Sequence, residues 1–264
     1  MGNPFSRQIA PAFLYESKGH QEALGRLHLM VENCHLGVLT GEVGSGKSTL
    51  IRSLFQSLNA KRYFPIYIST TGLKPRDFYG ELLRHVGEEI PFSLAKAKRF
   101  WADALDARQE QGDKSLVVVV DEAQEMSLSM LAELRFVVNQ QMDSYSLFPL
   151  ILVGQPELRR ILRLKKHEAI AQRIPMQYHL SGITAEETAA YIRHQMQAAS
   201  LTTPVFAESA ISHVHAASQG IPRVINLICS QALYDATQRG HEVIEENHII
   251  RVLTDLDRQR GVIG

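Results

Sequence analysis

A glycine-rich octapeptide at positions 41–48 constrains the fold of this chain more than any other feature. It fits the pattern G-x-x-x-x-G-K-[ST] and reads Gly41-Glu42-Val43-Gly44-Ser45-Gly46-Lys47-Ser48. The apolar run at residues 36–40 predicts a buried strand before it, and residues 48–55 predict an amphipathic helix after it. A strand, a glycine loop and a helix in this order predict a parallel α/β sheet with a phosphate-binding loop.

The chemistry of such a loop depends on backbone geometry. Its glycines let several N–H groups converge on one centre, and the N-terminus of the following helix adds positive potential. Lys47 is expected to reach the β- and γ-phosphates, and the Ser48 hydroxyl to hold Mg²⁺. We therefore expect ATP and Mg²⁺ as ligands, contacted by the eight loop residues and by Thr49, which follows them.

Composition limits the other classes of protein. The 264 residues contain 28 Lys and Arg and 28 Asp and Glu, so a DNA contact would need a local basic patch. Two distant cysteines, Cys34 and Cys229, do not make a disulfide framework, which favours a cytoplasmic setting. We see no signal peptide and no bilayer-spanning stretch, so we expect no membrane partner.

The chain changes its pattern near residue 181. Before it, expected strands alternate with helices, the strands at 36–40, 63–68, 116–120, 148–153 and 176–180. A helix is expected at about 20–31, before the first strand, and further helices are expected from Pro75, at about 96–109 and at 127–139. After it, a capping box at Thr184 opens a run of helices that continues at 206–217, 222–237 and 244–256. We expect a nucleotide-binding α/β core at 1–181 and a small helical lid at 182–264.

Polar side chains follow two of the expected strands. Asp121 and Glu122 come after four valines, at the strand end where open α/β sheets place their chemistry. We expect Asp121 to support the Mg²⁺ shell and Glu122 to polarise the attacking water, the alternative being a solvated acidic strand end. Gln155 ends the next strand, where it could hydrogen-bond phosphate or water; the alternative is a polar turn that starts a helix.

Two arginines are further candidates. Arg173 follows a charged helix and could supply transition-state charge to the ATP of a neighbouring subunit, although composition alone does not show this. Arg223 starts a lid helix within an apolar stretch, so we expect its guanidinium to need an anion. The γ-phosphate is one candidate for that anion, and a buried ion pair is the alternative.

The order of these motifs resembles the ExeA-type AAA+ ATPases. The resemblance covers Asn3 to about Leu256 and rests on the phosphate loop, Asn3-Pro4-Phe5, Val-Val-Val-Asp-Glu-Ala-Gln, Val-Gly-Gln-Pro-Glu-Leu, Gln-Arg-Ile and Gly-Ile-Pro-Arg-Val-Ile-Asn. It implies Walker A roles for Lys47 and Ser48 and Walker B roles for Asp121 and Glu122. It further implies sensor 1, arginine finger and sensor 2 roles for Gln155, Arg173 and Arg223. Gln155 departs from the wider superfamily, in which Asn or Thr is commoner at sensor 1.

The resemblance also implies partners. A finger that acts on a neighbour's nucleotide implies a homo-oligomer, either a ring or a helical filament. Proteins of this type occur as the cytoplasmic ATPase part of secretion-assembly proteins, which carry a transmembrane helix, and as stand-alone helpers of transposition. The helpers, similar to MuB, TnsC and TniB, bind duplex DNA when loaded with ATP and recruit or stimulate a transposase. With no membrane segment in the chain, we favour the second setting and expect sequence-tolerant DNA binding.

Candidate DNA contacts are five cations on two segments. They are Lys74, Arg76, Lys96, Lys98 and Arg99. In the similar helpers both regions face the central channel, whereas the alternative is an ordinary solvated surface. A third function, a small-molecule kinase that uses the same loop, is disfavoured by the Asp-Glu pair and by Arg223 in a helical lid.

Overall fold

The computed structural model describes residues 4–5, 14–137, 146–200 and 205–259. The chain divides into two compact units, and each is described by itself. The first, here called the sheet unit, contains residues 22–41 and 47–179. The second, the helical unit, contains the described residues of 1–21 together with 42–46 and 180–259.

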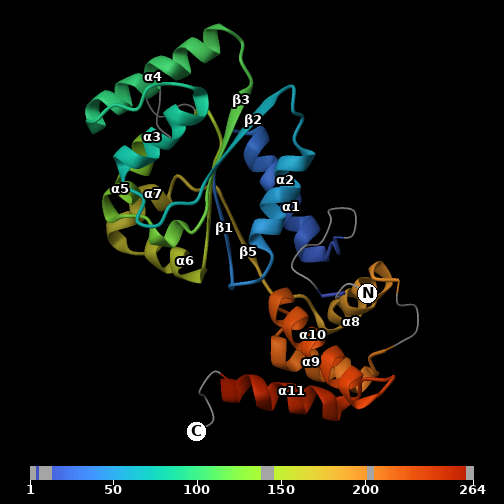
Figure 1. Cartoon of the computed structure of the whole chain (residues 1–264). Coiled ribbons are helices and arrows are strands. Elements are labelled where there is room, and N and C mark those ends of the chain that lie inside the picture. The colour runs from blue at the N-terminus through green and yellow to red at the C-terminus, as the bar shows by residue number, and fades with distance from the viewer. Residues whose placement is uncertain (1–3, 6–13, 138–145, 201–204, 260–264) are drawn as a thin grey trace. The chain divides into compact units, whose positions relative to one another are not determined.

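Five strands form one sheet in the order β2-β3-β4-β1-β5 (Figure 1). They are β1 (Leu36–Gly41), β2 (Tyr63–Ile68), β3 (Ser115–Val120), β4 (Leu150–Gly154) and β5 (Met176–Leu180). β4 pairs in parallel with both β3 and β1, and β2 pairs in parallel with β3. The valines of β3 are buried, as expected for a strand covered on both faces. The predicted parallel α/β sheet is confirmed.

Helices cover both faces of this sheet. Figure 1 shows α1 (Lys18–Glu32) and α2 (Lys47–Ser57) on one face and the remaining helices of the sheet unit on the other. The latter are α3 (Pro75–Val86), α4 (Leu94–Glu110), α5 (Leu128–Val137), α6 (Pro156–Leu162) and α7 (Glu168–Ala171), with the 3₁₀ turns η2 (Ala123–Glu125) and η3 (Lys165–His167).

The ends of these helices follow local chemistry. α3 starts with Pro75, whose missing N–H costs nothing in the first turn, and ends at Gly87 in the left-handed conformation. α4 begins two residues before the predicted Lys96, because the Ser93 hydroxyl accepts from the Lys96 N–H and caps the helix. The predicted helix at 127–139 is α5 as far as Val137, and its last two residues lie outside the described part.

The helical unit contains α8 (Ala185–Ala198), α9 (Glu208–Ser218), α10 (Pro222–Arg239) and α11 (Glu246–Gln259). The predicted capping box is present: Thr184 Oγ1 accepts from the Glu187 N–H, and the Glu187 carboxylate accepts from the Thr184 N–H. Before α10 two backbone segments touch, and the Ile183 N–H donates to the Gly220 carbonyl over 2.9 Å. Within the described residues, no helix combines the length and the apolar character needed to cross a bilayer.

Candidate active site

Three neighbouring strands bring the predicted residues to one edge of the sheet. β4 lies between β3 and β1, and the register pairs Val120 with Leu152 and Thr40 with Gly154. The carboxyl ends of parallel strands share an edge, so Asp121 and Glu122 after β3 lie beside Gln155 after β4. Lys47, which starts α2 after β1, belongs to the same edge.

The backbone of the glycine loop has the shape that a phosphate group requires. Gly44 and Gly46 have φ values of 86° and 104°, a region that favours glycine, and the Ser45 N–H donates to the Glu42 carbonyl. A Cβ atom at Gly44 would lie 2.5 Å from the Cβ of Arg223. The Ser45 hydroxyl is buried without a hydrogen-bond partner among the described residues. A curled loop with an orphaned polar atom fits a polyphosphate.

Lys47 is buried at the start of a helix. The residue is 8% exposed, and its Nζ donates to the Gly41 carbonyl over 2.7 Å. A cation at a helix N-terminus is opposed by the helix dipole, so this position suits a lysine whose partner is an anion. Ser48 is exposed and Thr49 half-buried, so the Ser48 hydroxyl is open to a metal ion.

Two hydrogen bonds fix the carboxylate of Asp121. Its Oδ1 accepts from the Glu122 N–H over 2.8 Å, and its Oδ2 accepts from the Tyr67 hydroxyl at the end of β2. Burial and the bond to Asp121 raise the pKa of Tyr67 far above its usual value, so the phenol remains a donor. Tyr67 was not among the predicted site residues, because its only signal in the sequence was a polar group near a strand end.

Glu122 is held by two amides. Its Oε2 accepts from Gln155 Nε2 over 3.3 Å and from Gln124 Nε2 over 2.6 Å. Its backbone has φ 51° and ψ 39°, a left-handed conformation that glycine adopts freely, that asparagine and aspartate tolerate, and that is strained for glutamate. The structure thus brings Glu122 and Gln155 together and adds Gln124, which the sequence analysis had not singled out.

The two arginines lie in different units. Arg173 is half-buried after α7 in the sheet unit, and its Nη1 donates to the Ala169 carbonyl over 3.0 Å. Arg223 is exposed in the helical unit, and its backbone N–H donates to the Gly44 carbonyl over 3.3 Å. Because Arg223 is exposed, burial by itself does not require an anionic partner, and the expected contact of its guanidinium with an anion stays a prediction. The apolar neighbours, such as Ile225, turn into the core instead.

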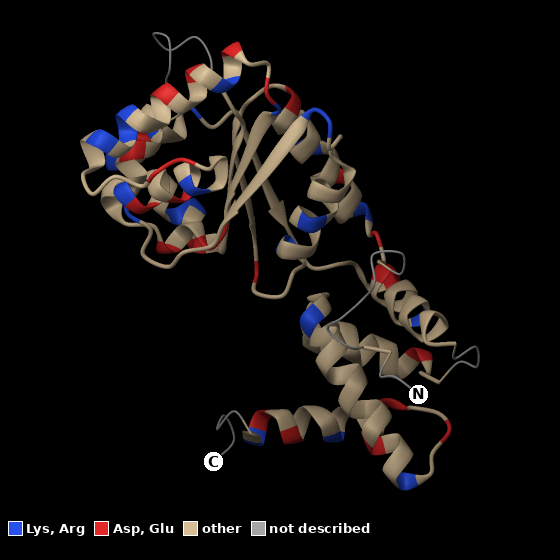
Figure 2. Ribbon diagram, turned by 45° about the horizontal axis from the view of Figure 1, so that its top comes forward, with Lys and Arg blue, Asp and Glu red and all other residues tan. Residues whose placement is uncertain are grey.

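The five candidate DNA contacts differ in how far they are available. Lys74, Lys96 and Arg99 are exposed. Lys98 Nζ lies 2.6 Å from Glu133 Oε1, and Arg76 reaches Asp77 at 3.6 Å and the Phe92 carbonyl at 3.3 Å. Figure 2 shows Lys and Arg intermingled with Asp and Glu over these helices rather than forming one uniformly basic face.

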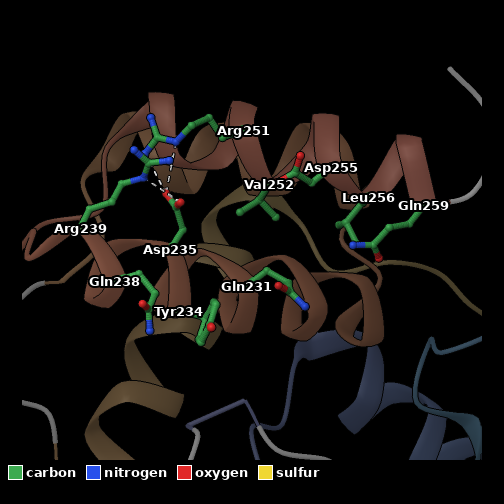
Figure 3. A pocket seen from close by; sticks show the side chains of 10 residues that line it. All are labelled: Gln231, Tyr234, Asp235, Gln238, Arg239, Arg251, Val252, Asp255, Leu256 and Gln259. Atoms are coloured by element: carbon green, nitrogen blue, oxygen red, sulfur yellow. Dashed lines mark hydrogen bonds and ion pairs between the residues drawn. The ribbon is translucent and has the colours of Figure 1, made fainter. Parts of the chain in front are cut away.

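A cavity of about 290 Å³ lies between α10 and α11 of the helical unit (Figure 3). In it, Asp235 accepts from Arg239 over 3.0 Å and from Arg251 over 2.8 Å. Partial burial alone would raise the pKa of Asp235, but the two guanidinium groups outweigh it and hold that pKa below its usual value. None of the predicted site residues lines this cavity, and we assign its ion pairs to holding α10 against α11.

The fold and the strand-end residues define a P-loop nucleotide-binding domain followed by a helical unit. Residues 30–162, half of the chain, match the family described as AAA domain, and the chain belongs to this family. It is 36% identical over 251 residues to General secretion pathway protein A of Aeromonas hydrophila, which confirms the resemblance to the ExeA type. The match covers 91% of this chain but only 44% of that protein.

Solved structures with little sequence identity share the fold. Cdc6p from Pyrobaculum aerophilum matches 91% of this chain and 67% of its own, with 17% identity and a TM-score of 0.66. The ORC1 protein of Aeropyrum pernix in complex with DNA matches 95% and 69%, with 17% identity and a TM-score of 0.64. RuvB of Thermotoga maritima, a Holliday junction branch migration motor, matches 90% and 70%, with 18% identity and a TM-score of 0.54.

Proposed function

We propose that this chain binds ATP with Mg²⁺ and hydrolyses it to ADP and phosphate. The observation that carries this proposal is the carboxylate of Glu122, hydrogen-bonded to Gln155 at the end of the neighbouring strand. Lys47, buried at the start of α2, belongs to the same edge of the sheet. A general base, a polar sensor and a phosphate-binding lysine at adjacent strand ends are the parts that phosphoryl transfer to water requires.

Each residue has a part in the proposed reaction. The loop N–H groups and Lys47 hold the β- and γ-phosphates, while Ser48 and Asp121 hold Mg²⁺. When bound, the metal ion neutralises charge on the phosphate oxygens. Glu122 takes a proton from water as the water oxygen bonds to the γ-phosphorus and the bond from that phosphorus to the ADP oxygen breaks. Gln155 orients the water or the γ-phosphate.

Two substitutions test this assignment. Lys47→Ala should lose ATP binding, because the ammonium group is the main cation of the loop. Glu122→Gln should bind ATP normally and lose at least about 100-fold in kcat, because an amide cannot take the proton. Binding is measured with a fluorescent ATP analogue and turnover by phosphate release. Normal turnover in Glu122→Gln would refute the assigned base.

We further propose that the protein acts as a homo-oligomer in which Arg173 reaches the nucleotide of a neighbouring copy. Its place after the short helix α7, where the residue is half-buried rather than enclosed, supports this role. Arg223 is proposed to contact the γ-phosphate from the start of α10. Its backbone bond to Gly44 supports that role, because the bond ties this residue to the glycine loop.

We propose duplex DNA as the partner of the ATP-loaded protein, which would then serve as a cytoplasmic helper that recruits or stimulates a transposase. Exposed Lys74, Lys96 and Arg99 support DNA binding, because such cations contact phosphates without reading bases. The ORC1 neighbour of the same fold was solved in complex with DNA.

A DNA titration with matched variants tests this proposal. Binding of duplex DNA is measured by anisotropy with ATP, with ADP and without nucleotide, at two salt concentrations. We expect ATP-dependent and salt-sensitive binding that tolerates changes of sequence. Lys96→Ala with Arg99→Ala should weaken binding and reduce the salt slope by about one for each lost phosphate contact. The control, Lys61→Ala with Lys114→Ala, removes equal charge just before β2 and β3, at the opposite edge of the sheet.

A second candidate function is favoured by one observation. The 36% identity to General secretion pathway protein A supports a role as the ATPase module of a secretion-assembly system. ATP turnover with no DNA binding at low salt, in any nucleotide state, would overturn the transposition proposal and favour this second candidate.

A further inference from the structure

Gln124, in the 3₁₀ turn η2 after the two acidic residues, has a side-chain amide with both ends engaged. Its Nε2 donates to Glu122 Oε2 over 2.6 Å, and its Oε1 accepts from the Gln155 backbone N–H over 3.0 Å. The two partners dictate which way the amide points. A backbone N–H can only donate, and an ionised carboxylate can only accept, so a flipped amide would satisfy neither.

The neighbouring strand is shaped to admit this amide. Gly154 ends β4, and a Cβ atom placed on it would lie 2.7 Å from Gln124 Oε1. Any larger residue at that position would push the amide away from the Gln155 N–H. The turn after β3 can therefore approach the end of β4 closely because Gly154 has no side chain.

The consequence for Glu122 is that one carboxylate oxygen is held and the other is open. Oε2 accepts from Gln124 and from Gln155, whereas Oε1 has no hydrogen-bond partner among the described residues. Glu122 itself is exposed, so without these bonds its side chain would sample many rotamers. The bond from Gln124 is the shorter of the two, and its donor is anchored to backbone.

We propose that Gln124 is a positioning residue for hydrolysis: it holds Oε2 of Glu122 so that Oε1 faces the attacking water. This inference rests on the proposed ATPase activity. Gln124 takes no proton and touches no reacting atom in this scheme. Its effect should therefore fall on kcat, whereas the affinity for ATP should stay unchanged.

Two substitutions separate positioning from packing. Gln124→Glu keeps the shape of the side chain but replaces the donor with a carboxylate that repels Glu122. Gln124→Leu removes the amide and leaves an apolar side chain that is one bond shorter. If the donated hydrogen bond matters, kcat should fall about tenfold in Gln124→Leu and further in Gln124→Glu, with KM unchanged within about twofold. If only packing matters, the Glu variant should be the milder of the two.

The experiment measures kcat and KM by phosphate release, ATP affinity with a fluorescent analogue, and Tm. Gln111→Glu, an equal change at an exposed position at the end of α4, is the control and should match the parent. With an active parent, a Gln124→Glu kcat within about twofold of the parent's, or a loss of ATP affinity equal to the loss of rate, would overturn this inference alone. An unaltered protein that binds ATP and does not hydrolyse it would overturn the ATPase proposal and this inference together.

Discussion

At the scale of single residues, the candidate site depends on side chains that hold other side chains. Tyr67 and Gln124 carry no assigned chemistry, yet each donates to one of the two acidic residues after β3. The acidic residues could be predicted, because a valine run followed by Asp-Glu is a local pattern. Tyr67 could not, because it lies 54 residues before Asp121 and only the folded sheet brings the two together.

The Tyr67 contact leads to a prediction about metal dependence. Tyr67→Phe removes the donor to Asp121 Oδ2 and leaves the carboxylate held on one side only. The half-saturating Mg²⁺ concentration for ATP hydrolysis should rise a few-fold, because a less ordered Asp121 carboxylate would hold the ion less well. A magnesium titration of phosphate release at saturating ATP measures this, and an unchanged midpoint would contradict the prediction.

At the scale of elements, the bounds of the strands could be predicted from the sequence, whereas their order in the sheet could not. The bounds of β2 and β5 agree with those expected. β4 starts at Leu150 rather than at Phe148. The order of the strands, which inserts β4 between β3 and β1, could not be predicted from periodicity, because pairing partners are a tertiary property.

The backbone contact between Ile183 and Gly220, before α10, leads to a prediction about stability. Gly220 has φ 72°, and a Cβ atom there would lie 2.0 Å from the Ile183 carbonyl oxygen. Gly220→Ala should cost more than about 3 kcal/mol, because it combines backbone strain with a clash against backbone. Gly240→Ala, at φ 68° with open space around it, should cost about 1 kcal/mol for the strain alone. Chemical denaturation measures the free energy of unfolding of both variants. Equal losses would contradict the role of the contact between Ile183 and Gly220.

The ion pairs between α10 and α11 lead to a prediction with a pH signature. Asp235→Asn should destabilise the helical unit by about 1 kcal/mol near pH 7, whereas Asp255→Asn, in an exposed pair, should cost less than about 0.5 kcal/mol. The folded pKa of Asp235 lies below its unfolded value of about 3.9, so its contribution is present above pH 4 and is lost as the pH falls further.

Thermal melts at pH 7 and pH 3 measure this difference between the parent and Asp235→Asn. We expect the gap in Tm to shrink at the lower pH. A gap that stays constant or widens would contradict the assignment of the charged pair.

At the scale of the whole molecule, the proposed reaction needs more than one copy of the chain. Arg173 and Glu122 would act on the same nucleotide from different protomers. Arg173→Ala and Glu122→Gln should each lose hydrolysis, while an equal mixture should recover up to about a quarter of the parent rate. The fraction follows because half of the sites keep Glu122 and half of their neighbours keep Arg173.

Phosphate release from the mixture measures this recovery, and co-purification of two differently tagged variants checks that mixed oligomers form. Mixed oligomers without recovered turnover would argue against a site shared between copies.

The left-handed backbone at Glu122 lowers the stability of the folded protein, and we expect it to be retained because the Glu122 carboxylate is needed for hydrolysis. Asparagine tolerates this conformation, so Glu122→Asn should release up to about 1 kcal/mol of strain. The same substitution removes the carboxylate that is proposed to act as the base. Glu122→Asn should therefore be inactive yet melt no lower than its parent in a thermal scan. A Tm of Glu122→Asn several degrees below that of the parent would contradict this prediction. If Glu122→Asn melts no lower than the parent, stability and catalysis place opposite demands on residue 122. The side chain that best tolerates this backbone conformation lacks the carboxylate that hydrolysis needs.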